Sequence, residues 1–186
     1  MRDVKAIQTK LFSLDILIGF CLFMGLCVGK LWFRQASVDE LTWLLRPVVW
    51  CLKWFLYGTF AYVDGKGFVS DSLGILIHKG CSGFHFLCIS LALAYFLSFP
   101  LPSKKRGKLW ILLIATFSAY LLTILSNTTR ILSGVAWLRL QTNMPSLQSF
   151  HFAHEMIGVV VYLSALILFS IGLQRFDDAN RNHQSA

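Results

Sequence analysis

Long apolar runs, each close to the length that crosses a bilayer, dominate the hydropathy pattern of this chain. Three of these runs contain no charged residue: Gly80 to Ser103, Leu109 to Thr129 and Met156 to Gln174. A fourth, Ile16 to Phe33, is interrupted only by Lys30, which lies close enough to its end to reach the headgroups. About 20 apolar residues are needed to cross the hydrocarbon core, so each run predicts one transmembrane helix. The fourth run is long for a cleaved signal peptide, which favours a signal anchor over cleavage.

The segment Leu41 to Val63 has a different pattern. Arg46 and Lys53 lie inside it near one helix face, with Trp43, Trp50 and Trp54 between and around them. Tryptophan and basic side chains together are typical of the membrane interface, so this segment predicts an interfacial or re-entrant helix. Pro47 fits a first turn or a kink of that helix. Asp64 to Gly67 then predicts a turn, and Phe68 to His78 a short β-prone or irregular segment.

The composition places the chain among integral membrane proteins. Of its 186 residues, 56% are hydrophobic and 14% charged, and the mean hydropathy is +0.63. In soluble domains about 45–50% of the residues are hydrophobic and about 25% are charged. The composition therefore excludes a soluble, disordered, coiled-coil or disulfide-rich chain. The expected fold is an all-α, polytopic transmembrane helix bundle with about four to six membrane segments. We expect one integral membrane domain over residues 1–186.

The net charge of +8 does not indicate a nucleic-acid partner, because the basic residues lie at the ends of the apolar runs. Instead they predict orientation. The basic segments at residues 2–10, 104–108 and 175–181 should be cytoplasmic. With four spans, both termini then lie inside, and the regions around Cys81, 127–130 and 151–155 lie together at the outer surface. If the Trp-rich segment crosses, one end must change sides.

Cys81 is the cysteine with the most reactive sequence context. It lies between Gly80 and Ser82-Gly83, where a loop is expected to enter a helix, and Lys79 is two residues away. A helix N-terminus and a nearby cation both stabilise a thiolate, which is the nucleophilic form. The structural alternative is a buried thiol at a glycine-rich bend. Cys21, Cys27 and Cys51 read as small hydrophobic residues.

Polar residues at two further boundaries could act with Cys81. Arg130 ends the run Leu109 to Thr129, where it is either a topological anchor or a functional cation, and Asn127 precedes it by three residues on the same expected helix face. His154 opens the last span, with His151 three residues earlier, and either is a candidate general base or a plain polar cap. The predicted topology brings these positions to one membrane face.

A metal site is the competing interpretation of Cys81. On a continuous helix, Cys81, His85 and Cys88 would share one face, with His78 just upstream, and such soft ligands can hold zinc, copper or haem iron. His85 and Cys88 run inward among apolar residues, however, and no second ligand cluster is evident in the sequence. We therefore expect no metal and no cofactor.

Three sequence blocks, taken in order, resemble a known family. Gly80-Cys81-Ser82-Gly83, Asn127-Thr128-Thr129-Arg130 and His154-Glu155 with Gly158 are similar to the signature blocks of the exosortase/archaeosortase family, over residues 68–169. The chain is short for that family and most resembles its compact members, the exosortase K type. The resemblance implies that Cys81 is the nucleophile, Arg130 the essential arginine and His154 the histidine of a catalytic triad.

The resemblance also implies a function. Family members are membrane cysteine transpeptidases that cleave C-terminal sorting signals of the PEP-CTERM type, made of a motif, a transmembrane helix and a basic tail. They pass the protein to an acceptor, here unknown, through a thioester. We thus expect an enzyme of the bacterial inner membrane with its active site toward the outer face and membrane-anchored proteins as substrates. The alternative is a non-enzymatic transporter subunit or assembly factor.

Overall fold

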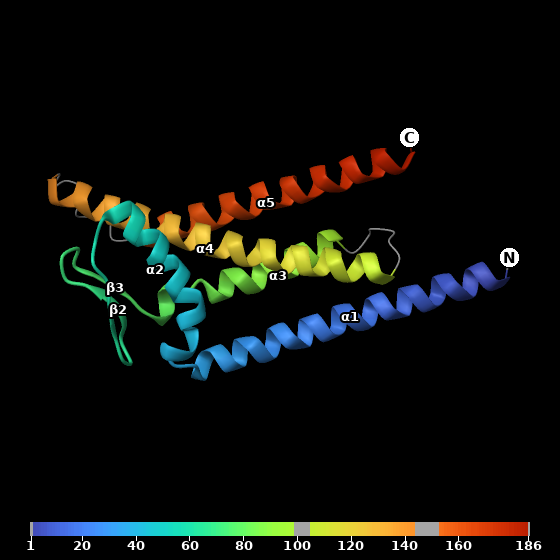
Figure 1. The fold of residues 1–186 in the computed structure, drawn as a ribbon, viewed down its shortest axis with the longest axis horizontal. Coiled ribbons are helices and arrows are strands. Elements are labelled where there is room, and N and C mark those ends of the chain that lie inside the picture. The colour runs from blue at the N-terminus through green and yellow to red at the C-terminus, as the bar shows by residue number, and fades with distance from the viewer. Residues whose placement is uncertain (1, 99–104, 144–152, 186) are drawn as a thin grey trace.

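The structure, a computed structural model, describes residues 2–98, 105–143 and 153–185. Its principal helices are α1 (Arg2–Gln35), α3 (Phe84–Ser98), α4 (Lys105–Asn143) and α5 (Ala153–Ser185) (Figure 1). Four described segments are long and apolar enough to cross a membrane: Leu17–Gln35, Lys79–Leu97, Leu112–Asn143 and Glu155–Arg175. The N- and C-terminal ends lie at the same end of the bundle, as an even number of spans requires. The predicted multi-pass helical membrane protein is confirmed.

The Trp-rich segment forms a helix shorter than the hydrocarbon core is thick. A short 3-10 turn, η1 (Asp39–Leu41), leads into α2 (Thr42–Leu56), which is 15 residues long. At 1.5 Å per residue it reaches roughly 22 Å, less than the hydrocarbon core of about 30 Å. Figure 1 shows α2 running across the bundle, at the end opposite the chain termini. This end, which carries α2 and the strands, is called the sheet end below.

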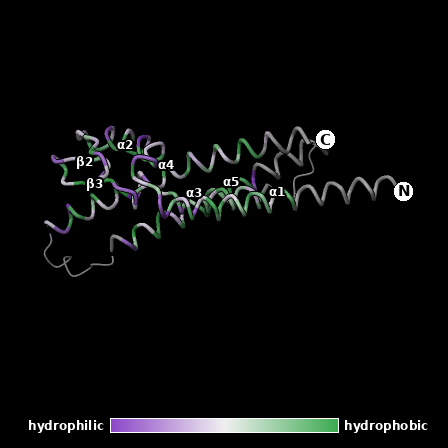
Figure 2. The backbone as a smooth tube through the Cα atoms, turned by 90° about the horizontal axis from the view of Figure 1, so that it is seen from below, coloured by the Kyte–Doolittle hydropathy of each residue, from purple (hydrophilic) through white to green (hydrophobic). Residues whose placement is uncertain are grey.

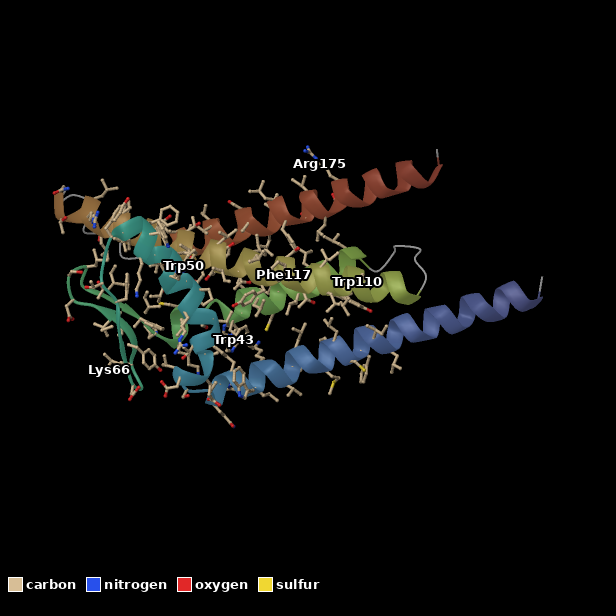
Figure 3. The ribbon with its side chains drawn as sticks, in the orientation of Figure 1. Trp43, Trp50, Lys66, Trp110, Phe117 and Arg175 are labelled. Carbon is tan, nitrogen blue, oxygen red and sulfur yellow. The ribbon has the colours of Figure 1, made fainter. Side chains whose placement is uncertain are left out.

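Helix α2 is strongly two-sided. One face is buried and consists of aliphatic residues: Leu44, Leu45, Val48, Val49 and Leu52. The opposite face exposes three tryptophans, Trp43, Trp50 and Trp54, together with Arg46 and Lys53. Figure 3 shows Trp43 and Trp50 nearer the sheet end, and Trp110 and Arg175 nearer the termini. An apolar face on the core and an aromatic, basic face outward are typical of an interfacial helix, as the sequence predicts.

Pro47 lies inside α2 and leaves one carbonyl of this helix without a donor, which α4 supplies. Proline has no amide hydrogen, so the carbonyl of Trp43, four residues earlier, loses its helical partner. The Tyr120 hydroxyl of α4 donates to that carbonyl at 3.0 Å, and the Trp43 and Tyr120 rings stack with centroids 5.9 Å apart. Because of the proline, the Trp43 carbonyl is free to accept the hydrogen bond that joins α2 to α4.

The residues between α2 and α3 form a small antiparallel sheet in the order β1-β2-β3. Its strands are β1 (Ala61–Val63), β2 (Gly67–Ser70) and β3 (Ile75–Ile77), with Phe68 paired to Tyr62 on one side and to Ile77 on the other. The predicted turn at 64–67 is confirmed and contains Gly65 at φ +71°. The chain is thus mostly helical, as the sequence predicts, and β3 and most of β2 fall in the segment 68–78 that the sequence predicts to be β-prone or irregular. Phe68 and Ile77 are buried and join the core beneath α2.

Helix α4 does not stop where the apolar run stops. The sequence predicts a span that ends at Thr129, whereas the helix continues unbroken to Asn143. Its 39 residues extend roughly 58 Å, about twice the thickness of the hydrocarbon core, so α4 projects beyond the membrane. Hydrophilic residues gather around α2 and the sheet, at the sheet end (Figure 2). Arg130 is therefore a mid-helix residue, inside the segment Leu112–Asn143 that is apolar enough to cross a membrane.

Candidate active site

Cys81 ends a single 3-10 turn, η2 (Lys79–Cys81), that follows β3. His78 organises this turn: its Nδ1 accepts the Gly80 amide hydrogen at 3.0 Å, and its carbonyl accepts that of Cys81 at 2.8 Å. Gly83 then adopts φ +71°, a left-handed conformation that favours glycine, before α3 begins at Phe84. Cys81 is half-buried. The predicted loop-to-helix junction is confirmed, but Cys81 precedes α3 instead of belonging to it.

Lys79 contacts the end of α1. Its Nζ donates to the Arg34 carbonyl at 3.2 Å and to the Ala36 carbonyl at 2.7 Å, and it lies 5.0 Å from the centre of the Phe33 ring. A cation at the C-terminus of a helix satisfies free carbonyls and interacts favourably with the helix dipole. The charge of Lys79 is therefore directed to the end of α1, and its support of a Cys81 thiolate stays a prediction.

Asn127 joins the turn of Cys81 to the membrane helices. Its side chain is fully buried in α4, and its Nδ2 donates to the Cys81 carbonyl. Its Oδ1 accepts from the Tyr162 hydroxyl of α5 at 2.9 Å. A Cβ atom added to Gly83 would come within 3.3 Å of the Asn127 side chain, so the absence of a side chain at Gly83 permits this approach. One amide thus holds Cys81 against both α4 and α5.

Arg130 lies next to the same tyrosine. Its Nη1 donates to the Tyr162 hydroxyl at 3.3 Å, and its guanidinium carbon is 5.6 Å from the centre of the Tyr162 ring. Gly158 of α5 gives the arginine room, because a Cβ atom there would lie 3.0 Å from Arg130 Nε. Tyr162 itself is fixed by stacking on Phe86 of α3, with ring centroids 4.5 Å apart. The guanidinium is therefore placed by contacts from α5.

His154 is located by the backbone of α5. It lies in the first turn of that helix, which begins at Ala153, four residues before Gly158. Residues four apart share a helix face, so His154 is on the face of α5 that approaches Arg130. His151 lies outside the described residues. The contacts thus connect Cys81, Asn127 and Arg130, while the place of His154 follows from helical register.

Tyr162 is the member of this group that sequence reasoning missed. Its hydroxyl connects Asn127 and Arg130, and its ring contacts α3 and α4. A signal was present, because His154, Gly158 and Tyr162 are spaced by four and therefore form one stripe of α5. A tyrosine within an apolar span also needs a partner for its hydroxyl.

The arrangement does not support the helical register that the metal interpretation requires. That interpretation needs Cys81, His85 and Cys88 on one continuous helix, but Gly83 interrupts the chain between the first and second of them. The His85 ring instead meets the Phe33 ring edge-on at 4.9 Å. Within the described ranges, no three His, Cys, Asp or Glu side chains are grouped so that they could hold a metal ion.

Fold and contacts together define a multi-pass helical membrane protein in which the backbone carbonyl of Cys81, the Asn127 amide and the Arg130 guanidinium are connected at the sheet end through Asn127 and Tyr162. Comparison with known families agrees with this class. Residues 9–171 match the family described as transmembrane exosortase (Exosortase_EpsH), and the chain belongs to that family. The matched region runs from α1 into α5 and does not distinguish subtypes, so the exosortase K type stays a prediction. No curated protein and no solved structure matches the chain significantly.

Proposed function

We propose that this protein is a cysteine transpeptidase that cleaves C-terminal sorting signals of membrane-anchored proteins and transfers the product to an acceptor. Membership in the exosortase family supports the reaction class. The observation that carries the residue assignment is the hydrogen-bonded path from the Cys81 carbonyl through Asn127 and Tyr162 to Arg130. Cys81 is the nucleophile, His154 the general acid and base, Arg130 the oxyanion-stabilising cation, and Asn127 a supporting residue.

The reaction follows from these roles in two balanced steps. The Cys81 thiolate attacks the scissile carbonyl, a carbon–sulfur bond forms, and the negative charge that develops on the carbonyl oxygen is stabilised by Arg130. As the carbon–nitrogen bond breaks, protonated His154 gives its proton to the leaving amine. Neutral His154 then removes a proton from the acceptor, which attacks the thioester and releases the Cys81 thiolate. Arginine suits its role because it stays charged in a partly desolvated site.

The site depth fits a substrate cut just outside its transmembrane helix. Arg130 directly follows the uncharged run that ends at Thr129, and Cys81 lies two residues after the start of the apolar segment Lys79–Leu97. We place the sheet end toward the outer face of the bacterial inner membrane, because the basic clusters of the sequence lie at the opposite end. A sorting motif that follows a translocated domain would then meet Cys81 at headgroup depth.

The polar residues also favour surface chemistry over a transport path. Among the described residues of α4, the buried polar side chains fall within one short stretch, 123–128. The hydroxyls of Thr123 and Thr128 are used within the helix, since each donates to the carbonyl four residues earlier. A transporter would need polar groups distributed through the membrane depth.

The decisive experiment is co-expression of a tagged sorting-signal protein with wild type and variants, with loss of the signal helix followed on a gel. We expect processing to disappear in Cys81→Ala, Cys81→Ser and His154→Ala, and to survive in Cys88→Ala and His151→Ala. Hydroxylamine should release the tagged protein from wild type but from no Cys81 variant, because it cleaves thioesters. Equal processing by wild type and Cys81→Ala would refute the nucleophile. If processing is lost in His151→Ala but retained in His154→Ala, the role of general acid and base belongs to His151 instead of His154.

A further inference from the structure

A polar groove opens on the exposed side of α2, separate from the candidate active site. It has a volume of about 450 Å³ and is lined by residues of η1, α2, β1 and the turn after β1: Asp39, Thr42, Trp43, Arg46, Tyr62 and Asp64. It therefore contains one guanidinium, two carboxylates and two aromatic rings. The Tyr62 hydroxyl donates to Asp39 Oδ1, which holds that carboxylate in place. This hydrogen bond raises the pKa of Tyr62, so the hydroxyl keeps its proton.

The groove lies at the level of the lipid headgroups. Asp39 comes four residues after Gln35, where the span of α1 ends. Trp43, which also lines the groove, stacks its ring on Tyr120 of the membrane helix α4. The exposed face of α2 continues away from the groove with Trp50 and Trp54, which are 63% and 67% exposed. Tryptophan and arginine on one exposed face are typical of a helix that contacts headgroups.

The charges of the groove are complementary to a zwitterion. A single guanidinium matches a phosphate, and two carboxylates on the neighbouring η1 turn and β1–β2 turn match an ammonium group. An aromatic ring beside them adds an attractive face for the same cation. We propose that this groove binds the headgroup of a phospholipid with a phosphate and a primary ammonium, with Arg46 on the phosphate and Asp39 and Asp64 on the ammonium.

A substrate peptide fits the groove less well. Asp39, Trp43 and Arg46 lie on the exposed side of α2 and η1, whereas the opposite face of α2 belongs to the buried core. Cys81 packs against that core. A peptide held in the groove would thus be separated from the thiol by the thickness of α2. The same zwitterionic chemistry also occurs in soluble glycerophosphoethanolamine, which the test must distinguish from a lipid.

The test measures lipid binding by the full-length protein in lipid nanodiscs or mixed micelles and needs no cleavage assay, so it is independent of the proposed reaction. The probes are phosphatidylethanolamine, phosphatidylglycerol and soluble glycerophosphoethanolamine, each followed by native mass spectrometry. We expect wild type to bind phosphatidylethanolamine about tenfold more tightly than phosphatidylglycerol, because hydrogen bonds to charged groups are strong. Arg46→Gln should bind both lipids more weakly. Asp39→Asn should lose only the preference for phosphatidylethanolamine over phosphatidylglycerol. Lys53→Gln, a cation on the same face outside the groove, is the matched control.

Four results would overturn the proposal. Equal affinity of wild type for the two lipids would rule out the ammonium site. Equal lipid affinities of Arg46→Gln and Lys53→Gln would rule out the phosphate site. Competition by soluble glycerophosphoethanolamine as strong as that of the lipid would assign the groove to a free metabolite, and displacement of lipid by a sorting-signal peptide would assign it to substrate. Tyr62→Phe, which removes one hydroxyl, provides a mild variant if Asp39→Asn does not fold, and should weaken the preference in the same direction.

Discussion

Two tyrosine hydroxyls, those of Tyr120 and Tyr162, lie at contacts between helix α4 and its neighbours, and they differ in what they hold. Toward α2, the Tyr120 hydroxyl completes a backbone hydrogen bond by donating to the Trp43 carbonyl. Toward α5, the Tyr162 hydroxyl donates to Asn127 and accepts from Arg130, so it joins two side chains of the candidate site. The first contact stabilises the architecture, and the second positions chemistry.

The difference arises from the groups that need a partner. Pro47 leaves one carbonyl of α2 without a helical donor, and a single hydroxyl satisfies it. Asn127 is fully buried and has both donor and acceptor atoms, while Arg130 is charged and half-buried. Such groups are stable only when several partners surround them, so the α4–α5 contact requires Tyr162, Gly158 and the Cys81 carbonyl together. Changes at the second contact should therefore affect processing, and changes at the first should affect stability.

The largest effect is expected from Arg130→Lys. Lysine keeps the charge but loses the planar guanidinium that contacts Tyr162 and would stabilise the oxyanion, so we expect processing to fall about 100-fold or more. The measurement is the rate of signal-helix loss from a tagged substrate. Arg139→Lys, an exposed arginine farther along α4, is the control and should process like wild type. Wild-type rates for Arg130→Lys would show that any cation at this position suffices.

Gly158→Ala should give the next largest effect. The new methyl group would lie 3.0 Å from Arg130 Nε, so the guanidinium must shift by a few tenths of an ångström while the helix itself tolerates alanine. Because small displacements of catalytic groups are costly, we expect about a tenfold loss of processing with unchanged expression.

Gly172→Ala in the same helix is the matched control for Gly158→Ala, since a Cβ atom there would meet nothing within 4 Å. Equal processing by the two alanine variants would mean that α5 does not position Arg130. Equal loss in both would point to a general effect of alanine on α5 instead.

Much of this architecture could be predicted from the sequence, because apolar runs and their flanking charges are local properties. The four spans, the interfacial character of α2 and the turn at 64–67 all follow from patterns within single segments. The length of α4 could not be predicted this way. The run ends at Thr129, but a helix ends only where its backbone does, and nothing between Arg130 and Asn143 breaks it.

The site was partly predictable for the same reason. Cys81 was indicated by its glycine-rich junction, and Asn127 and Arg130 by their place at the end of an apolar run; the structure connects the three. Tyr162 and the carbonyl partners of Lys79 were missed, because both depend on which distant backbone or side chain lies opposite. Polar groups that need hydrogen-bond partners can be recognised in the sequence, but the tertiary packing determines which backbone or side-chain groups become those partners.

Tyr162→Phe and Tyr120→Phe form a direct comparison of the two contacts, with a smaller expected effect. Each variant removes one hydroxyl and keeps the ring. Loss of a hydrogen bond worth about 1 kcal/mol that orients Arg130 should slow processing about fivefold in Tyr162→Phe. Tyr120→Phe should process normally but unfold at a lower temperature in detergent. The reverse pattern, with processing slowed only by Tyr120→Phe, would contradict the assignment of the two contacts.

The smallest effect tests whether Pro47 is the reason that Tyr120 is needed. In Pro47→Ala, the new amide hydrogen can bond the Trp43 carbonyl within α2, so the carbonyl no longer depends on α4. Tyr120→Phe should then cost less in the Pro47→Ala background than in wild type, with a coupling of about 0.5–1 kcal/mol in the free energy of unfolding. Four proteins suffice: wild type, both single variants and the double variant, each unfolded thermally in the same detergent. Additive effects would show that the Tyr120 hydroxyl holds α2 independently of the proline, since no shared acceptor would then connect the two residues.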